Sequence, residues 1–287
     1  MNSHRPSTAS DRIIIPPFVG EFGWFIIRTI REVDKHPAKH KVVCCRPGQE
    51  IFFPSADTFF YDYDAAFKAK GRNAKVPTKG LGRLWHVQAA NVIAEKCRDS
   101  NPDYADHEIF NTKKGNCYKL SKDIYHFPKL TPKLEYDPVD VVFSTRNRKE
   151  FKGKNRSADF YDSTLELLKE NGYTTGVVGI KKQSIDLPSA DSRSWDYPDE
   201  DDATVAMMQN AKLVVATNTG IAHLAVMLRC PLFVIENTPA MMCWMEMQRD
   251  PNIYFERMLE RGKRKEKLFE RRGRNHILGY LDKCYAI

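Results

Sequence analysis

Residues Leu213 to Ile235 read LVVATNTGIAHLAVMLRCPLFVI, a pattern that predicts a strand, a tight polar turn, a helix and a second strand. The first four residues form a short apolar run of the kind found in buried parallel strands. Small polar residues follow from Thr217 to Gly220, and apolar residues then recur at helical spacing from Ile221. Pro231 ends the helix, and the last apolar run is the second strand. Such a unit indicates an α/β protein.

The turn in this unit has the features of an anion-binding site. The start of a helix offers backbone N–H groups without intrahelical partners, and the side chains of Asn218 and Thr219 add further donors beside them. Gly220 allows a phosphate to approach the backbone closely, and His223, one turn later, can donate a hydrogen bond to it. Spacing alone leaves an alternative open, in which Thr219 only caps the helix and His223 is an ordinary surface histidine.

The segment TNTGIAHLAVMLRCPLFVI resembles the heptosyltransferase family, a group within the GT-B glycosyltransferases. In that family an (S/D)-(N/D)-(T/S)-G-x-x-H-L-A run binds the diphosphate of a nucleotide sugar, and Asn218 stands where Asp is usual. The resemblance implies an α/β GT-B fold, with two Rossmann-like domains facing across a cleft. It also implies a C-terminal helix that crosses back onto the first domain.

The composition is that of a soluble globular protein, with 42% hydrophobic and 29% charged residues. The 287 residues are enough for two modest domains, each with its own core. No apolar run approaches the roughly twenty residues that cross a bilayer, and the first ten residues lack a hydrophobic signal core. We therefore expect a cytoplasmic protein, with a peripheral membrane contact left open.

The cysteines argue against two kinds of cross-link, and the net charge indicates an anionic partner. Seven cysteines without a CxxC pair argue against a disulfide framework and against a zinc site. The formal net charge of +8 fits an anionic substrate, an anionic membrane face or nucleic acid, and does not choose among them.

The first part of the chain repeats the arrangement of strand, glycine-containing turn and helix. A strand is predicted at Arg12 to Ile15, and the helix after the turn has Phe25, Ile26, Ile30 and Val33 on one face. In the resembling family the equivalent turn carries a Gly-Asp pair whose carboxylate is the proposed catalytic base, and here Gly20 and Glu21 take that place. A carboxylate there can remove the proton of an acceptor hydroxyl as it attacks the anomeric carbon. The alternative is that Glu21 only interacts with the helix dipole.

Weaker signals complete the first domain, which we place at residues 1–124. Strands are predicted at Lys41 to Cys45 and at Ile51 to Phe53, and a helix at Leu84 to Cys97 with Trp85, Ala89, Val92 and Ile93 facing inward. The aromatic tract from Ser55 to Tyr63 is either core or a surface for a sugar ring. The basic loop from Lys68 to Arg83 is either solvated or an acceptor-binding loop.

Three further segments follow the first domain. Residues 125–138 are rich in proline and are predicted to be a linker, and residues 139–252 are predicted to be the nucleotide-sugar-binding domain. Residues 253–287 are predicted to be a basic C-terminal region, helical from about Ile253 to Arg272, that packs back on the first domain. Solvation is the alternative for its basic face, and the candidate contacts are Leu268, Phe269, Ile277, Leu278 and Leu281.

A second group of candidate phosphate ligands follows the predicted strand at Val139 to Phe143. Hydroxyls and cations just past a strand suit a diphosphate, because hydroxyls donate to its oxygens and arginine adds charge and bidentate geometry. A solvated basic loop is the alternative. The candidates are Ser144, Thr145, Arg146 and Arg148.

The nucleoside and metal sites are less well defined by the sequence. In the resembling fold the irregular stretch from Lys181 to Pro198 would hold the nucleoside, with Trp195 or Tyr197 as a stacking ring. The acids from Asp199 to Asp202 precede a helix and are explained by the helix dipole. We expect neither a metal site nor a cofactor.

The function predicted from the sequence is transfer of a sugar from a nucleotide-diphosphate donor to a hydroxyl of a glycan or lipid-linked acceptor. Displacement by an activated hydroxyl predicts inversion, and cationic donors with a helix dipole can stabilise the departing diphosphate without a metal. One alternative is a nucleotide-sugar epimerase or hydrolase on the same fold. Another is a non-catalytic basic adaptor that binds a membrane or, less favoured, nucleic acid.

Overall fold

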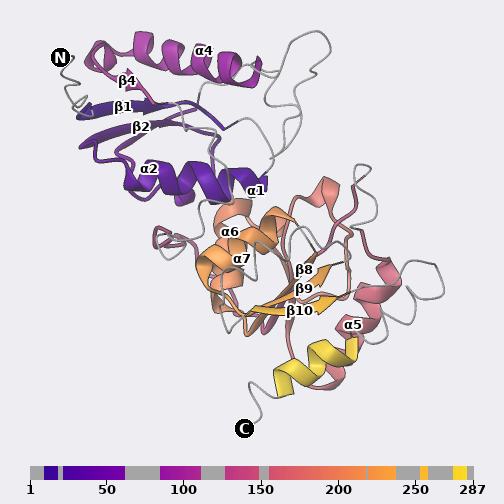
Figure 1. Ribbon diagram of the computed structural model, residues 1–287. Helices are drawn as coiled ribbons and strands as arrows, with labels where there is room; N and C mark the ends of the chain where they lie inside the picture. The colour runs from indigo at the N-terminus through magenta and orange to yellow at the C-terminus, as the bar shows by residue number, and fades with distance from the viewer. Residues whose placement is uncertain are drawn as a thin grey trace. The chain divides into compact units, whose positions relative to one another are not determined.

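A computed structural model of the chain contains two compact units, Met1–Gly115 and Asn116–Ile287, and each is built on a parallel sheet (Figure 1). The division between the units falls nine residues before the predicted linker. The residues that the structure describes are 10–18, 22–61, 85–110, 127–148, 155–217, 219–236, 253–257 and 274–282.

The sheet of the first unit has four parallel strands in the order β3-β2-β1-β4. Its central strand β1 has the predicted bounds, and Ile13, Ile14 and Ile15 are fully buried in it. A run of three isoleucines that is buried on both faces is what a central parallel strand requires. The strands are β1 (Arg12–Ile15), β2 (His40–Cys44), β3 (Thr58–Phe60) and β4 (Glu108–Ile109).

Helices cover both faces of this sheet (Figure 1). On one face, α1 (Phe22–Trp24), a π-helical turn (Phe25–Ile30) and α2 (Arg31–Lys35) run on from one another, and the predicted inward residues are all buried. On the other face lies α4 (Trp85–Ser100). The prediction that Val92 faces inward was wrong, since its side chain is 61% exposed. The buried side of α4 is formed at helical spacing by Ala90, Ile93, Ala94 and Cys97.

One further strand prediction in the first unit was wrong, and two short elements were not predicted. The apolar run predicted as a strand at Ile51 to Phe53 is a 3-10 turn, Glu50–Phe52. An apolar run of three residues is too short for its hydrophobic periodicity to distinguish a strand from a turn. The third strand lies instead in the aromatic tract, at β3, and its Phe59 and Phe60 are half-buried. Strand β4 and the short 3-10 helix Pro102–Tyr104 were not predicted.

The sheet of the second unit has six strands, all parallel, in the order β10-β9-β8-β5-β6-β7. From β5 the chain adds strands in one direction as far as β7, and then returns to the other side of β5 and continues from β8 to β10. This is the doubly wound Rossmann order, and the direction reverses between β5 and β8. The strands are β5 (Val141–Ser144), β6 (Thr175–Val177), β7 (Ser192–Arg193), β8 (Leu213–Thr217), β9 (Leu232–Glu236) and β10 (Ile253–Arg257).

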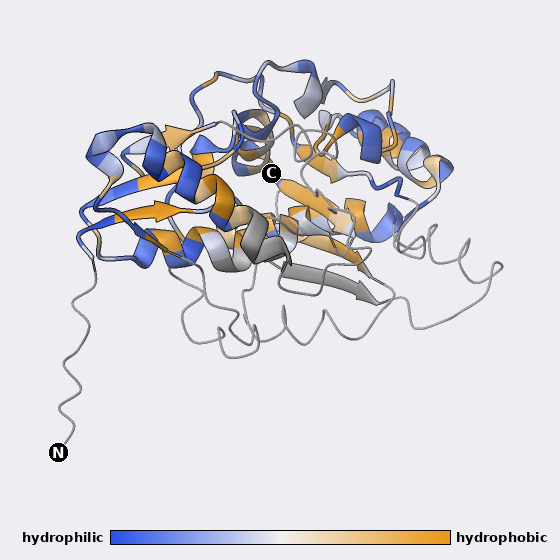
Figure 2. Ribbon diagram, turned by 90° about the horizontal axis from the view of Figure 1, so that it is seen from above, coloured by the Kyte–Doolittle hydropathy of each residue, from blue (hydrophilic) through white to orange (hydrophobic). Residues whose placement is uncertain are grey.

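Helices α5 (Ala158–Glu170) and 274–282 cover one face of this sheet, while α6 (Glu200–Asn210) and α7 (Gly220–Leu228) cover the other (Figure 1). The strands between them are the most apolar part of the unit, as Figure 2 shows. None of the helices in the described part of the chain combines the length and the apolar character that crossing a bilayer would require.

The C-terminal region differs from its prediction. Ile253–Arg257 is the edge strand β10 and not the start of a helix. Its β-branched and aromatic residues favour a strand. The helical prediction had relied on the basic residues that follow it. Ile277 and Leu281 are fully buried in the core of the second unit, with Leu278 packed against them. The predicted contacts Leu268 and Phe269 lie outside the described residues.

The described part of the predicted linker, residues 127–138, is bound along α6. The buried carboxylate of Asp202 accepts hydrogen bonds from the backbone N–H groups of Lys133 (2.9 and 3.0 Å) and Leu134 (2.9 Å) and from the Tyr136 hydroxyl (3.2 Å). Leu130 is buried, and its carbonyl accepts a hydrogen bond from Gln209. This segment is therefore a fixed part of the second unit.

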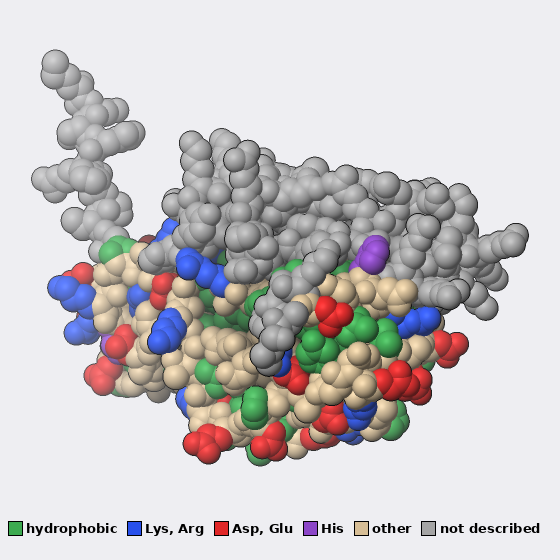
Figure 3. All heavy atoms as spheres, turned by 90° about the horizontal axis from the view of Figure 1, so that it is seen from below, with side chains coloured by type: hydrophobic (Ala, Val, Ile, Leu, Met, Phe, Trp, Pro, Cys, Tyr) green, Lys and Arg blue, Asp and Glu red, His purple; other side chains and the backbone are tan. Residues whose placement is uncertain are grey.

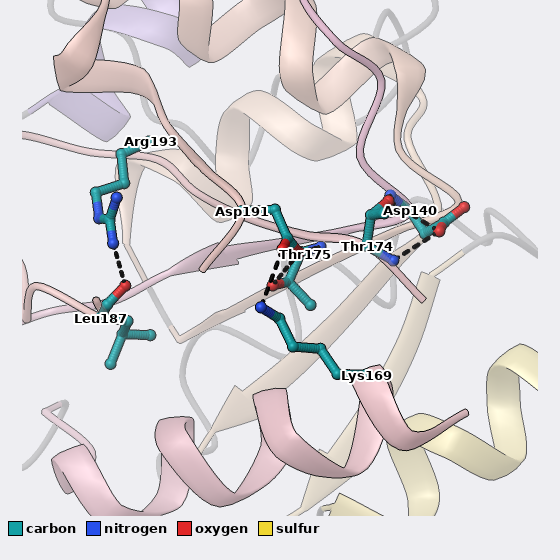
Figure 4. A network of polar contacts seen from close by, with 7 residues as sticks. All are labelled: Asp140, Lys169, Thr174, Thr175, Leu187, Asp191 and Arg193. Atoms are coloured by element: carbon teal, nitrogen blue, oxygen red, sulfur yellow. Dashed lines mark hydrogen bonds and ion pairs between the residues drawn. The ribbon is translucent and has the colours of Figure 1, made fainter. Parts of the chain in front are cut away.

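Two aspartates, Asp140 and Asp191, link neighbouring strands of the second unit at the amino ends of those strands (Figure 4). Asp140 accepts hydrogen bonds from the backbone N–H (2.8 Å) and hydroxyl (2.9 Å) of Thr174 and forms an ion pair with Lys212 (3.0 Å). Asp191 binds Thr175 in the same way and pairs with Lys169. Burial alone would raise the pKa of Asp140, but the hydrogen bonds from Thr174 and the Lys212 charge outweigh it and lower the pKa.

We predict that Asp202→Ala lowers the free energy of unfolding by about 2 kcal/mol, because three donors in the 133–136 segment lose a buried charged acceptor. Asp199→Ala is the matched control. Asp199 caps α6 through the N–H groups of Asp201 and Asp202, and its loss should cost only about 1 kcal/mol. Urea denaturation of both variants measures this, and equal losses would contradict a special role for Asp202.

The lowered pKa of Asp140 predicts a pH-dependent loss of stability. The carboxylate stabilises the fold above its unfolded-state pKa, and that contribution disappears as the pH falls through the lower folded-state pKa. Asp140→Asn should therefore be less stable than the original chain at pH 7 by about 1 kcal/mol, and the deficit should shrink below about pH 4. Urea titrations between pH 7 and pH 3 test this, with the exposed Asp137→Asn as control. A deficit that is constant with pH would refute the assignment.

Candidate functional site

The candidate site lies at the carboxyl edge of the six-stranded sheet, where the strand order reverses. Strands β5 and β8 are parallel neighbours there, and Ser144 pairs in register with Ala216. The residues that follow these two strands therefore leave the sheet side by side. In open α/β sheets this reversal point is where a crevice forms and ligands bind. The two segments predicted to bind phosphate, which are about seventy residues apart in sequence, are brought together by this pairing.

Two threonine hydroxyls at the end of β8 are buried without hydrogen-bond partners among the described residues. They are the Oγ1 atoms of Thr217, whose residue is only 1% exposed, and of Thr219. Thr219 occupies the N-cap position of α7, yet its side chain makes no capping hydrogen bond. The alternative in which Thr219 serves only as a cap is therefore not what the structure shows. Buried hydroxyls are nearly always paired, so these two, beside a helix start, are candidate donors to an external partner.

The N-terminus of α7 adds backbone donors beside these hydroxyls. The N–H of His223 donates to the carbonyl of Thr219 (3.3 Å), and the N–H groups of Gly220 to Ala222 come before it in the first turn. With the helix dipole they favour an anion. His223 is half-buried on this turn, and its predicted bond to a phosphate stays a prediction. Asn218 lies outside the described residues, so its predicted role stays a prediction.

The loop after β5 is held by contacts that the sequence did not predict. The Thr145 hydroxyl donates to the carbonyl of Ile185 (2.8 Å), and the backbone N–H of Asn147 donates to the carbonyl of Gln183 (2.8 Å). The backbone N–H of Arg148 donates to the side chain of Asn155. The Thr145 proton, which was predicted for a phosphate, is therefore used inside the protein. Among the described residues of the loop, the backbone N–H groups of Asn147 and Arg148 are thus already used within the protein.

Two buried arginines bring positive charge to this loop. Arg146 is 5% exposed and Arg156 is 4% exposed. A guanidinium stays protonated at any physiological pH, so both positions are cationic in the folded protein. On the face in Figure 3, by contrast, Lys and Arg side chains are interspersed with Asp and Glu wherever described residues are visible. The described residues of that face therefore form no single-sign patch.

The predicted nucleoside-binding rings have contacts within the protein. Trp195 packs against the core of the second unit, and its indole nitrogen is buried without a partner in the described ranges. The Tyr197 ring meets Tyr136 edge to face at 4.6 Å, and its hydroxyl shares a hydrogen bond with Ser192. Stacking of either ring on a base stays a prediction.

The predicted base, Glu21, lies outside the described residues. Its sequence neighbours Phe18 and Phe22 both pack on Phe25, and a cluster of phenylalanines continues to Phe52 and Phe53 after β2. Within the ranges that the structure describes, no group of three or more His, Cys, Asp or Glu side chains is placed to hold a metal ion.

Sequence reasoning missed Asn155 and the role of Thr217 in this site. Thr217 was seen as the start of a polar turn, and its burial is known only once β8 is placed in the sheet centre. Asn155 lies seven residues from Arg148, inside a run of basic residues, and only the folded loop brings the two together. The available signal was a hydroxyl residue directly after the apolar run of a predicted buried strand.

Comparison with known proteins shows the fold. No protein-family model and no curated protein matches the sequence. Among solved structures, Escherichia coli ADP-heptose lps heptosyltransferase II aligns with a TM-score of 0.56 at 11% identity, over 94% of this chain and 99% of its own. A family 9 glycosyl transferase from Veillonella parvula aligns with a TM-score of 0.52 at 10% identity, over 88% and 87%.

A third structure is E. coli heptosyltransferase WaaC with ADP-2-deoxy-2-fluoro heptose, with a TM-score of 0.50 at 12% identity, over 95% and 99%. At such identities the likeness shows the fold alone. The fold is that of the GT-B glycosyltransferases, and the resemblance to the heptosyltransferases indicated by the segment 217–235 is confirmed at that level.

The unpaired Thr217 hydroxyl leads to a prediction about stability. Thr217→Val removes a buried polar atom that has no partner, so the unfolding free energy should stay the same or rise by up to about 1 kcal/mol. The control is Thr164→Val in α5, where the buried hydroxyl donates to the carbonyl of Phe160, and this variant should lose about 1 kcal/mol. Thermal and urea unfolding of both variants measure the difference. A loss at Thr217 as large as that at Thr164 would mean that its hydroxyl is satisfied within the protein.

Proposed function

We propose that this protein is a glycosyltransferase that moves a sugar from a nucleoside-diphosphate donor to a hydroxyl of a glycan or lipid-linked acceptor. The observation that carries the proposal is the pair of buried threonine hydroxyls, Thr217 and Thr219, at the start of α7 where the strand order reverses. A diphosphate supplies the acceptor oxygens that such donors lack. The GT-B fold supports the choice of reaction, and it does so by analogy.

In this proposal the second unit binds the donor through its diphosphate. Thr219, Gly220 and the α7 N-terminus hold one phosphate, with His223 and Asn218 beside it. Ser144 and Arg146, from the neighbouring strand end, neutralise the charge that develops as the diphosphate departs. Fixed dipoles and guanidinium groups can supply this stabilisation, so the reaction requires no divalent metal in principle.

Glu21 is the proposed general base in the first unit. Removing the proton of the acceptor hydroxyl during attack typically contributes a factor of about 10² to 10⁴ to the rate. A single displacement by that hydroxyl inverts the anomeric carbon. The structure of WaaC holds an ADP sugar analogue, and adenosine is therefore the first nucleoside to test.

Donor binding tests the site. Isothermal titration calorimetry with ADP, GDP, UDP and CDP should show at least one nucleoside diphosphate that binds, and Thr219→Val should weaken that binding about tenfold, since it removes one donor to a phosphate. Nucleoside diphosphates that all fail to bind, or a Thr219→Val variant that binds as the original does, would overturn the proposed donor site.

Turnover tests the base. Glu21→Gln should lower kcat by about 10² to 10⁴ while donor affinity is retained, because the amide keeps the shape but accepts no proton. Glu95→Gln, on the exposed side of α4, is the matched control and should leave kcat unchanged. Incubation of the donor without acceptor should yield almost no free sugar. Rapid release of sugar or conversion of the donor would favour a hydrolase or an epimerase instead.

A further inference from the structure

One side chain, Asn155, contacts two of the residues that follow β5. Its Nδ2 donates to the carbonyl of Arg148 (2.9 Å), and its Oδ1 accepts from the backbone N–H of the same residue (3.3 Å). The carboxamide therefore pairs with both backbone groups of Arg148, as a neighbouring strand would. This pairing fixes the position of Oδ1 relative to the strand end.

The same oxygen also accepts a hydrogen bond from a terminal nitrogen of the buried Arg146 guanidinium. Asn155 thus uses three of the four hydrogen bonds that a carboxamide can make, all of them on residues 146 and 148. Among similar side chains, aspartate would lack the donor for the Arg148 carbonyl, and alanine would lack all three bonds. Asparagine also holds the guanidinium without adding a negative charge beside it.

We propose that Asn155 is a positioning residue that presets Arg146 for the donor diphosphate. This inference rests on the proposed function of the site. A long arginine side chain loses rotamer freedom when it binds a ligand, and a partner that orders it beforehand reduces that loss. Preset charge is also what stabilises a departing diphosphate, since it needs no rearrangement during the reaction. Asn155 acts through Arg146 and does not itself contact the donor.

A double-mutant cycle tests the inference. Calorimetry with the best-binding of ADP, GDP, UDP and CDP, and with its monophosphate, is carried out on the original protein, Arg146→Met, Asn155→Ala and the double variant. Each single change should weaken diphosphate binding about tenfold and reduce the preference for diphosphate over monophosphate. The double variant should bind as Arg146→Met does, because Asn155 has no effect once its target is gone.

Two further variants separate positioning from folding. Asn155→Asp keeps an acceptor for Arg146 but adds a negative charge, so its diphosphate binding should be weakened at least as much as that of Asn155→Ala. Asn171→Ala is the matched control, since Asn171 only donates to the carbonyl of Leu167 at the end of α5, and its binding should be unchanged. Thermal unfolding monitors each variant, and Asn155→Ser replaces Asn155→Ala if the latter does not fold.

The outcomes distinguish this inference from the proposed function. If the original protein binds a nucleoside diphosphate and Arg146→Met weakens it, but Asn155→Ala binds normally or its effect adds fully to that of Arg146→Met, then Asn155 does not act through Arg146. An equal loss of diphosphate and monophosphate affinity in Asn155→Ala would likewise overturn the inference and leave the donor site intact. If no nucleoside diphosphate binds the original protein, the proposed function fails and this inference fails with it.

Discussion

The parallel pairing of β5 with β8 is the constraint on which the site depends. It sets Ser144 beside Ala216, and so places the loop that contains Arg146 next to the turn that contains Thr219. Both strands are buried in the centre of the sheet. Burial of their apolar side chains stabilises the fold only when the strands lie in that position. A slip of one residue would move every side chain of the strand to the other face of the sheet, so the core keeps the two loops in register.

Polar side chains at the two ends of the strands in this sheet differ in their hydrogen bonding. At the amino edge, Asp140 and Asp191 each accept hydrogen bonds from a threonine of the neighbouring strand and form an ion pair with a lysine (Figure 4). Their carboxylate oxygens therefore have hydrogen-bond donors. At the carboxyl edge, the Thr217 and Thr219 hydroxyls are buried without partners in the described structure. Satisfied polar groups stabilise a fold, and orphaned ones cost it free energy. The edge proposed to bind the donor is thus the one whose threonine hydroxyls lack partners in the described structure.

The sequence predicted the elements with a strong period and missed those set by long-range contacts. Strand β1 and the unit from β8 to β9 were found because apolar runs and helical spacing are local signals. The two-residue strands β4 and β7 have no period, and they form only because a longer strand lies beside them. Prolines in residues 125–138 predicted a linker, and no local signal indicates that Asp202, far along the chain, binds the described part of it. Asn155 was missed for the same reason.

A crystal structure with a bound nucleoside diphosphate would show whether the carboxyl ends of β5 and β8 bind the diphosphate. We expect phosphate oxygens within hydrogen-bonding distance of Thr219 Oγ1 and of the first N–H groups of α7, with the Arg146 guanidinium on the same diphosphate. A nucleotide bound at the amino edge of the sheet, or anywhere that leaves the Thr217 and Thr219 hydroxyls without a partner, would contradict it.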